Sequence, residues 1–442
     1  MGASRPYAIV GAGPAGMSLA RAFQARDLPF VVLERHADIG GIWNPAHPGT
    51  PIYRSAHFIS SRSQSGYLGF PMPESYPDYP SAAQILDYHR AFVAAYDLER
   101  HVRFETGVER AEPDGEGWRL QLDGGETLEA AGVICATGTN WDPIVPEWPG
   151  EFDGEIRHAV TYSDPSEFAG RRVLVVGAGN SGCDIACDAA ANADAAFISL
   201  RRGYHFVPKH IFGVPADVFA ESGPKLPMWL TQRVFGLMLR LLVGDLSRLG
   251  LPRPDHRIFE THPILNDQLL HHLRHGDIAV RGDLESLDGD AVIFADGRRE
   301  RVDLVILATG YRHSLPYLPE DAVDWKGSRP QLYLNLFSRR EPGLMALGLM
   351  ETDGGAYRLF DQMAHVIACH AADRLRAPDK AARLEAIKLE MPDLSGGVRY
   401  LASERHGNYV QHDAYLKELA RLRRRMDWPD LSLQELRLSP AA

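Results

Sequence analysis

Two segments of the chain repeat one pattern, in which a short apolar strand runs into a glycine-rich turn and a helix. The turns are Gly11-Ala12-Gly13-Pro14-Ala15-Gly16 and Gly177-Ala178-Gly179-Asn180-Ser181-Gly182. Both fit G-x-G-x-x-G, in which the glycines permit a tight turn, a close pyrophosphate and close packing of helix on strand. The free N–H groups at the helix N-terminus then face the phosphates. The sequence therefore predicts two Rossmann-like dinucleotide-binding folds.

The end of the next strand distinguishes the two predicted nucleotides. Glu34 ends that strand in the first unit, near the usual spacing of about 20 residues for a carboxylate that binds ribose hydroxyls. Arg201 and Arg202 stand at the corresponding place in the second unit. Guanidinium groups pair with a 2′-phosphate, which a carboxylate would repel. The first site thus suits FAD or NAD and the second suits NADPH, although Arg201 and Arg202 could also form a solvated surface pair.

Two further strand-like runs end in similar small-residue turns, Ala136-Thr137-Gly138 and Ala308-Thr309-Gly310-Tyr311. Each turn closes one of the two folds, so the fold class is α/β with the NADPH domain inserted in the FAD domain. We predict that residues 1–164 form the first part of the FAD-binding domain. Residues 165–302 form the NADPH-binding domain, with a helical substrate lid at about 204–265. Residues 303–442 complete the FAD-binding domain and add C-terminal helices.

Composition excludes several other classes of protein. The net charge of -11 and the lack of a basic stripe argue against nucleic-acid binding. Four cysteines without a C-x-x-C pair, and no room for a signal peptide before the first strand, favour the cytoplasm. Arg233 and Arg240 interrupt the apolar stretch 226–244, so we expect a buried or lid helix and no membrane span, with membrane-surface contact as the lesser alternative. His271, His272 and His275 lack further ligands, and we predict no metal site.

Other motifs resemble one family. Phe152, Gly154, His158 and Tyr162 fit F-x-G-x-x-x-H-x-x-x-Y just before the second fingerprint, and Gly40-Gly41-Ile42-Trp43 is similar to a G-G-x-W flavin loop. Together with the segment 70–81, these motifs resemble the flavin-containing monooxygenases, which are class B flavoprotein monooxygenases. The resemblance covers about residues 5–370. The middle segment is most similar to the branch that contains plant YUCCA-type and many bacterial enzymes.

The resemblance implies an activity. An NADPH- and FAD-dependent monooxygenase forms a C4a-hydroperoxyflavin from O2 and oxygenates a nitrogen or sulfur nucleophile of a small molecule. Ser60, Asn180 and Gln362 are implied near the flavin ring or the nicotinamide, and Ser60 stands where many members carry Asn. A hydroxyl donates one hydrogen bond, where an amide offers two donors. The segment 152–162 is implied to couple domain movement to turnover, although His158 could simply tie the linker by hydrogen bonding.

The residues expected to bind the two cofactors come from the fingerprints, the flavin loop, the strand ends and the closing turns. They are Gly11, Gly13, Pro14, Ala15, Gly16, Glu34, Arg35, Gly41, Ile42, Trp43, Val108, Ala136, Thr137, Gly138, Gly177, Gly179, Asn180, Ser181, Gly182, Arg201, Arg202, Thr309, Gly310, Tyr311 and Gln362.

Three alternatives stay open from the sequence. Baeyer–Villiger oxygenation or YUCCA-like oxidative decarboxylation of a ketone or keto acid would use the same cofactors. An NADPH-dependent flavin disulfide reductase would need a reactive cysteine pair. A flavin-based redox sensor would have no use for the complete second fingerprint. For the oligomeric state we favour a homodimer on general frequency alone.

Overall fold

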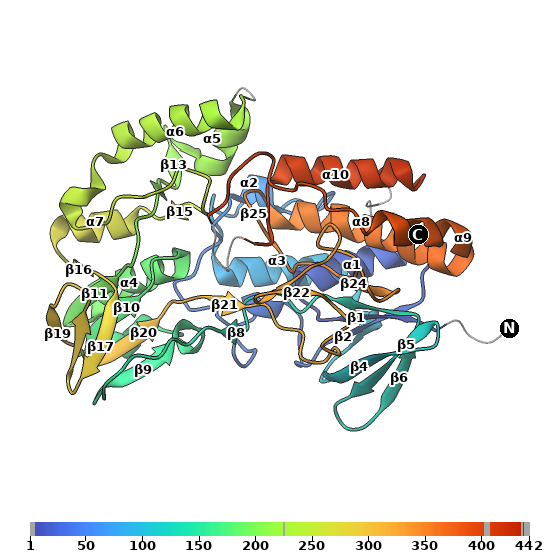
Figure 1. Ribbon diagram of the computed structural model, residues 1–442, viewed down its shortest axis with the longest axis horizontal. Helices are drawn as coiled ribbons and strands as arrows, with labels where there is room; N and C mark the ends of the chain where they lie inside the picture. The colour runs from blue at the N-terminus through green and yellow to red at the C-terminus, as the bar shows by residue number, and fades with distance from the viewer. Residues whose placement is uncertain (1–4, 224–225, 402–406, 435, 437–442) are drawn as a thin grey trace.

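The protein is built around two parallel five-stranded sheets (Figure 1). The computed structural model describes residues 5–223, 226–401, 407–434 and 436. The first sheet has the order β24-β7-β1-β2-β3, formed by Leu344–Ala346, Gly132–Cys135, Tyr7–Val10, Phe30–Leu33 and Val102–Arg103. The second has the order β16-β11-β10-β20-β9, formed by Ile278–Arg281, Ala195–Ser199, Arg172–Val176, Leu304–Leu307 and Glu155–His158. The predicted α/β class with two Rossmann-like folds is confirmed.

The helices that follow the two glycine-rich turns are α1 (Pro14–Gln24) and α4 (Asn180–Asn192). Helix α1 packs on the long C-terminal helix α8 (Ala356–Arg376), and Arg21 of α1 forms a buried ion pair with Asp361 of α8 at 2.6 Å. Helices α3 (Ala82–Ala95), α9 (Pro378–Ile387) and α10 (His412–Arg425) complete this domain. Helix α4 lies on its own sheet together with α7 (Gln268–His275). The C-terminal part of the chain thus returns to the first sheet, as an inserted second domain requires.

Smaller β-units flank the sheets. One three-stranded antiparallel sheet joins β4 (Val108–Asp114), β5 (Gly117–Leu122) and β6 (Thr127–Ala130). Another joins β17 (Leu284–Asp288), β18 (Ala291–Phe294) and β19 (Arg299–Arg301). Two short pairs, β22 (Trp325–Lys326) with β23 (Arg329–Pro330) and β25 (Glu351–Thr352) with β26 (Tyr409–Val410), lie in the C-terminal part.

The chain passes between the two domains at two neighbouring places. Strand β8 (Asp142–Pro143) pairs antiparallel with β21 (Tyr311–Arg312), and just beyond them β9 lies parallel to β20 in the second sheet. The predicted boundaries at 164/165 and 302/303 leave both β9 and β20 outside the inserted domain. The division into domains stays a prediction. A division that keeps the second sheet whole would begin before β9 and end after β20.

A lid covers the second domain at the top of Figure 1. It contains α5 (Ala216–Ser222), α6 (Met228–Val243) and two strand pairs, β12 (Phe206–Val207) with β15 (Ile264–Leu265) and β13 (His210–Ile211) with β14 (Val214–Pro215). The lid has its own small apolar core, which includes Leu239 and Ile258. Short helix α2 (Arg62–Ser65) contacts α5 from the other domain. Among the described residues, no helix is long and apolar enough to cross a membrane.

Candidate functional site

The two glycine-rich turns have the same geometry. Gly11 has a φ of 108°, and a Cβ there would lie 2.7 Å from the carbonyl oxygen of Ala136. Gly177 has a φ of 104°, and its Cβ would lie 2.5 Å from the carbonyl oxygen of Ala308. In each fold the first glycine therefore rests against the small-residue turn that closes the fold. Only glycine tolerates both the left-handed backbone and the close contact.

The third glycine of each turn allows the helix to cross its strand closely. A Cβ on Gly16 would lie 1.9 Å from the carbonyl oxygen of Gly11, and one on Gly182 would lie 2.1 Å from that of Gly177. No side chain caps the N-terminus of α1 or of α4, where Gly13 and Gly179 are the capping residues. The first N–H groups of both helices are thus left for a phosphate.

The strand-end residues differ as the sequence indicates. Glu34 is buried and accepts hydrogen bonds from the backbone N–H groups of Ala12 and His36, at 2.7 and 3.0 Å. Its carboxylate is therefore fixed beside the first turn. Arg201 is exposed, and the buried Nε of Arg202 has no hydrogen-bond partner among the described residues. A donor in that state fits an anionic ligand that the chain itself does not supply.

One cavity of about 2190 Å³ joins both turns. Its lining contains all of the predicted cofactor-binding residues except Gly16 and Gln362. Gly16 is expected to allow close packing of α1 on its strand, and a residue with that role does not need to line the cavity. Trp141 also lines the cavity, with a buried indole N–H that no described residue accepts and with the Arg35 guanidinium 5.6 Å from its ring centre. These observations fit two bound dinucleotides that share one space.

Gln362 does not lie where we predicted. Its side-chain oxygen accepts a hydrogen bond from Arg423 of α10 at 2.9 Å, and it is not part of the cavity wall. Phe360, two positions earlier on α8, lines the cavity instead. Arg358, one turn earlier on nearly the same side of α8, does line the cavity, so Gln362 lies too far along the helix to reach it and contacts α10 instead. The prediction assigned the correct helix but a position about one turn beyond the cavity.

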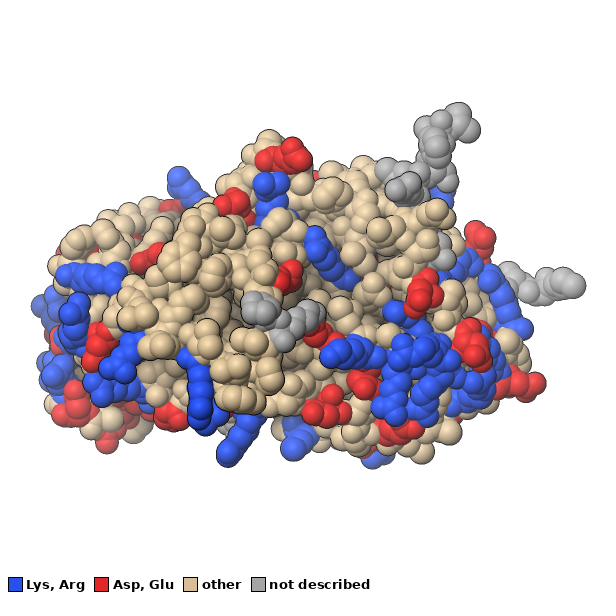
Figure 2. All heavy atoms as spheres, turned by 90° about the horizontal axis from the view of Figure 1, so that it is seen from above, with Lys and Arg blue, Asp and Glu red and all other residues tan. Residues whose placement is uncertain are grey.

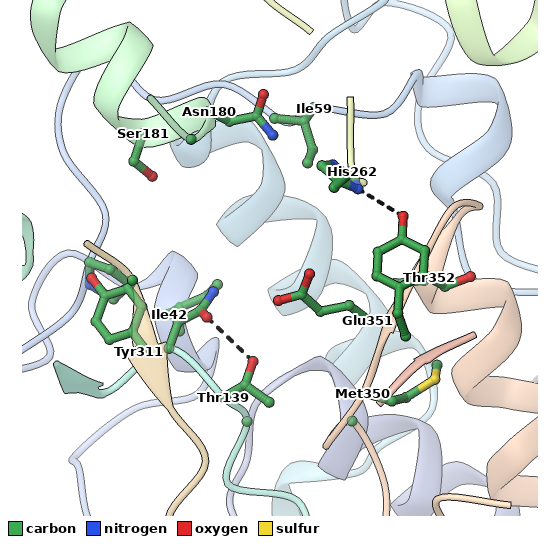
Figure 3. Close-up of a pocket in the computed structure, with 18 of the residues that line it drawn as sticks. Ile42, Ile59, Thr139, Asn180, Ser181, His262, Tyr311, Met350, Glu351 and Thr352 are labelled. Carbon is green, nitrogen blue, oxygen red and sulfur yellow. Dashed lines mark hydrogen bonds between the residues drawn. The ribbon is translucent and has the colours of Figure 1, made fainter. Parts of the chain in front are cut away.

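Ser60 and Asn180 both line the cavity. The side-chain oxygen of Asn180 accepts a hydrogen bond from the backbone N–H of Leu265 at 3.2 Å, so it holds the β15 segment of the lid. Figure 3 shows Ile59 near Asn180, together with His262, whose Nδ1 lies 2.9 Å from the Tyr409 hydroxyl. Ile59 could not be predicted as a cavity residue, because a single apolar residue in a loop matches no functional motif.

Within the linker segment 152–162, His158 and its neighbour Ala159 line the cavity. The Nδ1 of His158 accepts from the backbone N–H of Val160 at 3.1 Å, and its Nε2 lies 3.1 Å from the carbonyl oxygen of Gly310. These partners require a neutral ring protonated at Nε2, and burial lowers the pKa of His158. The imidazole therefore ties β9 to the turn after β20. This geometry agrees with the simpler of the two predicted parts for His158, that of a linker tie.

Two carboxylates on α4, which the sequence did not reveal as functional, join three parts of the chain. Asp184 accepts hydrogen bonds from the Tyr53 hydroxyl at 3.1 Å and from the Asn266 amide at 2.6 Å. Burial raises the pKa of Asp184 to about 6.

Asp188, one turn later on α4, accepts hydrogen bonds from the hydroxyls of Ser55 and Tyr162, the latter at 2.8 Å. Burial also raises its pKa. Tyr162 ends the linker motif, while Ser55 belongs to the loop that leads to Ser60. We call Asp184, Asp188 and these four partners the α4 clasp.

The other residues that the sequence singled out are unreactive or lie away from the cavity. All four cysteines are buried thiols outside any disulfide, and burial raises the pKa of both Cys183 and Cys187. A thiol in that state is a poor nucleophile, which removes support from a disulfide reductase. Phe152 and Gly154 do not line the cavity. The described residues contain no group of three or more potential metal ligands.

The comparisons with known proteins agree with this geometry. The family model "Flavin-binding monooxygenase-like" matches residues 4–429. The chain belongs to this family. As a flavin-binding monooxygenase-like protein it is an oxidoreductase, which uses FAD and NADP with O2.

Similar family members come from plants and animals. Rice indole-3-pyruvate monooxygenase YUCCA1 is 36% identical over 328 residues, which cover 72% of this chain and 79% of that relative. Human flavin-containing monooxygenase 5 is 30% identical over 444 residues, covering 94% of this chain and 83% of that relative.

Solved flavin monooxygenases share the fold. An oxidized steroid monooxygenase bound to NADP superposes with a TM-score of 0.74 at 18% identity, covering 96% of this chain and 98% of that one. The flavin-containing monooxygenase of Stenotrophomonas maltophilia superposes with a TM-score of 0.66 at 24% identity, covering 84% and 99%. At these identities the likeness concerns the fold alone.

Proposed function

We propose that this flavin monooxygenase oxygenates the nitrogen or sulfur atom of a neutral or cationic, largely apolar small molecule. The charge of the cavity wall on the lid and C-terminal sides carries this proposal. Among the described residues of that part, Arg358 and Lys417 are the basic ones. Five carboxylates line the same part: Asp217, Glu221, Glu351, Asp353 and Asp413. Such a wall attracts a protonated amine and disfavours an anionic acid.

Glu351 is the most informative of these carboxylates. It lies in β25, and Figure 3 shows its side chain directed into the pocket between Thr139 and His262. Apolar residues surround the same space, among them Phe235, Phe259, Met350 and Phe360. A wall of this kind would exclude water and hold an apolar body while the carboxylate orients a basic nitrogen.

The cofactors supply the redox chemistry: when bound, NADPH provides the hydride and the flavin passes electrons to O2. The chain provides binding and exclusion of water. The helix N-termini after Gly13 and Gly179 would hold the pyrophosphates, and Arg201 with Arg202 would hold the 2′-phosphate of NADPH. On this proposal no side chain needs to act as a strong acid or base, and the neutral His158 keeps its proton on Nε2.

The test compares three substrates of similar shape: an aryl-alkyl tertiary amine, the corresponding thioether and the corresponding arylpyruvate. Incorporation of one atom from labelled O2 and the consumption of NADPH are measured for each. We expect oxygenated amine and thioether. Glu351→Gln should lower kcat/KM about fivefold for the amine, which corresponds to roughly 1 kcal/mol for one ion pair, and leave the thioether unchanged. Glu112→Gln, on β4 away from the cavity, is the matched control.

A second candidate is oxidative decarboxylation of a keto acid, which is favoured by the 36% identity to a protein named indole-3-pyruvate monooxygenase. The same experiment separates the two candidates. If the arylpyruvate gives the highest kcat/KM and releases CO2, the second candidate replaces the first. Equal loss for amine and thioether in Glu351→Gln would show that the carboxylate does not recognise charge.

A further inference from the structure

The lid helix α6 presents an apolar stripe to solvent. Trp229, Leu237 and Leu241 are spaced by multiples of four residues and therefore share one side of the helix. Their exposed fractions are 54%, 62% and 79%, and the adjacent Val234 is 53% exposed. Arg233 has the same spacing and lies between Trp229 and Leu237, so the stripe is apolar apart from one guanidinium. A group of large exposed apolar side chains can mark an interaction site.

The outer stripe is not needed to hold the lid together. The opposite side of α6 is already packed, because Leu239 is buried in the lid core and the Gln232 amide donates to the carbonyl oxygen of Ile258 at 3.1 Å. Phe235 and Thr231 face the cavity. Truncating the outer residues would therefore leave the inner contacts of the lid intact, so their apolar character calls for another explanation.

The charged residues of α6 itself are basic, while the acidic Glu221 and Asp245 are exposed near its two ends. The charged residues of α6 are Arg233 and Arg240, both exposed, and the guanidinium of Arg233 lies 5.6 Å from the Trp229 ring centre. On α10 the exposed residues are Lys417, Arg421 and Arg424. The whole chain has a net charge of -11, so these two helices differ from the average surface.

Both helices lie at the top of Figure 1, and Figure 2 looks down on that side. It shows a broad area with few charges over the lid, and many Lys and Arg side chains with Asp and Glu among them toward the end of the molecule that carries α9 and α10.

We propose that this face docks on the surface of an anionic lipid bilayer, with α6 lying in the plane of the interface. Tryptophan and leucine would enter the boundary between headgroups and acyl chains, while Arg233 and Arg240 extend to the phosphates. The positive residues of α10 would add attraction that depends on anionic lipid. Docking of two copies through the same stripe is disfavoured, because a twofold interface would bring the arginines of one copy near those of the other.

The experiment is flotation of the FAD-loaded enzyme with vesicles of phosphatidylcholine alone and with vesicles that contain phosphatidylglycerol. We expect binding to the anionic vesicles, and release in high salt as screening shortens the range of the charges. Leu237→Glu combined with Leu241→Glu should abolish flotation. Val145→Glu combined with Ile156→Glu changes two exposed apolar residues on the β8–β9 side of the molecule, and this control should float like the wild type.

A second pair of variants tests the charge. Arg421→Gln combined with Arg424→Gln should lower the partition coefficient roughly tenfold or more, since each basic residue near an anionic membrane contributes about 1 kcal/mol. Bound FAD and turnover of a water-soluble substrate in detergent-free buffer should match the wild type for all variants, which shows that they fold.

Two outcomes would overturn the proposal. One is flotation that is unaffected by Leu237→Glu with Leu241→Glu. The other is a wild-type protein that ignores vesicles but sediments as a dimer, which the same double variant converts to a monomer. The latter result would assign the stripe to a second copy of the chain.

Discussion

The two nucleotide folds of this protein share a framework and differ in what surrounds it. In both, the first glycine rests on the closing turn and the third glycine meets the carbonyl oxygen of the first. The helix after the first turn is fixed by the buried ion pair of Arg21 with Asp361 at 2.6 Å. The helix after the second turn is held by the α4 clasp, in which each carboxylate accepts hydrogen bonds from two other segments.

The two kinds of contact differ in how easily they can be broken. Water does not reach the buried ion pair of Arg21 with Asp361. Breaking the pair would therefore leave an unpaired charge in the protein interior. Hydrogen bonds from hydroxyls and an amide to half-buried carboxylates can be exchanged for water at lower cost. The comparison therefore predicts that α1 is held more rigidly in the first fold than α4 is in the second.

The largest expected effect comes from filling the third glycine of each turn. Gly16→Ala should weaken FAD binding, and Gly182→Ala should weaken NADPH binding while the flavin stays bound. Overpacking of about 1–3 kcal/mol corresponds to about fivefold to 150-fold in affinity. The flavin-to-protein absorbance ratio and the rate of flavin reduction by NADPH measure the two effects.

Gly236→Ala is the control for these variants, because it adds the same atom to a helix of the lid where nothing lies within 4 Å. If Gly182→Ala loses its flavin as completely as Gly16→Ala, the two folds do not act separately.

A smaller effect is expected from the strand-end charges. Arg201→Ala with Arg202→Ala should raise the KM for NADPH about tenfold and leave that for NADH nearly unchanged, since a charge-assisted hydrogen bond at a partly exposed site contributes about 1.5 kcal/mol. Steady-state kinetics with both nucleotides provide the measurement. Arg298→Ala with Arg299→Ala removes an adjacent exposed pair from the same domain and should change neither KM. An equal rise for NADPH and NADH would contradict the 2′-phosphate assignment.

The smallest effect concerns the clasp and depends on pH. Burial raises the pKa of Asp184 from 3.8 to about 6, so the folded protein binds its proton more tightly than the unfolded chain does. Stability from this group is therefore greatest at low pH and falls as the pH rises from about 4 to about 6. Asp184→Asn removes this dependence.

The measurement is the free energy of unfolding by urea at several pH values. Relative to the variant, the wild type should become less stable between pH 4.5 and pH 7. Asp194→Asn, an exposed carboxylate just after α4, should follow the wild type at every pH. A pH-independent difference in the free energy of unfolding between wild type and Asp184→Asn would contradict the assignment of this pH dependence to Asp184.

The local parts of this protein could be predicted well, and the reason is physical. A strand, a glycine-rich turn and a helix form from contiguous residues, so Gly11 to Gly16 and Gly177 to Gly182 reveal their geometry in the sequence. Gln362 was placed wrongly because the sequence does not tell how far along α8 the cavity wall extends. Asp184 and Asp188 were missed because their partners, such as Tyr53 and Asn266, are brought near only by tertiary folding. The pairing of β9 with β20 could not be foreseen for the same reason, since it joins distant segments. The edges of the inserted domain stay a prediction.

That pairing has a mechanical consequence. A domain tethered by one strand of chain can swivel about any axis, whereas here β8 and β21 form a ribbon and His158 fastens β9 to Gly310 just beyond it. Two crossings fixed side by side would resist twisting more than bending. Any movement of the inserted domain relative to the first sheet would therefore be easiest as bending across this ribbon.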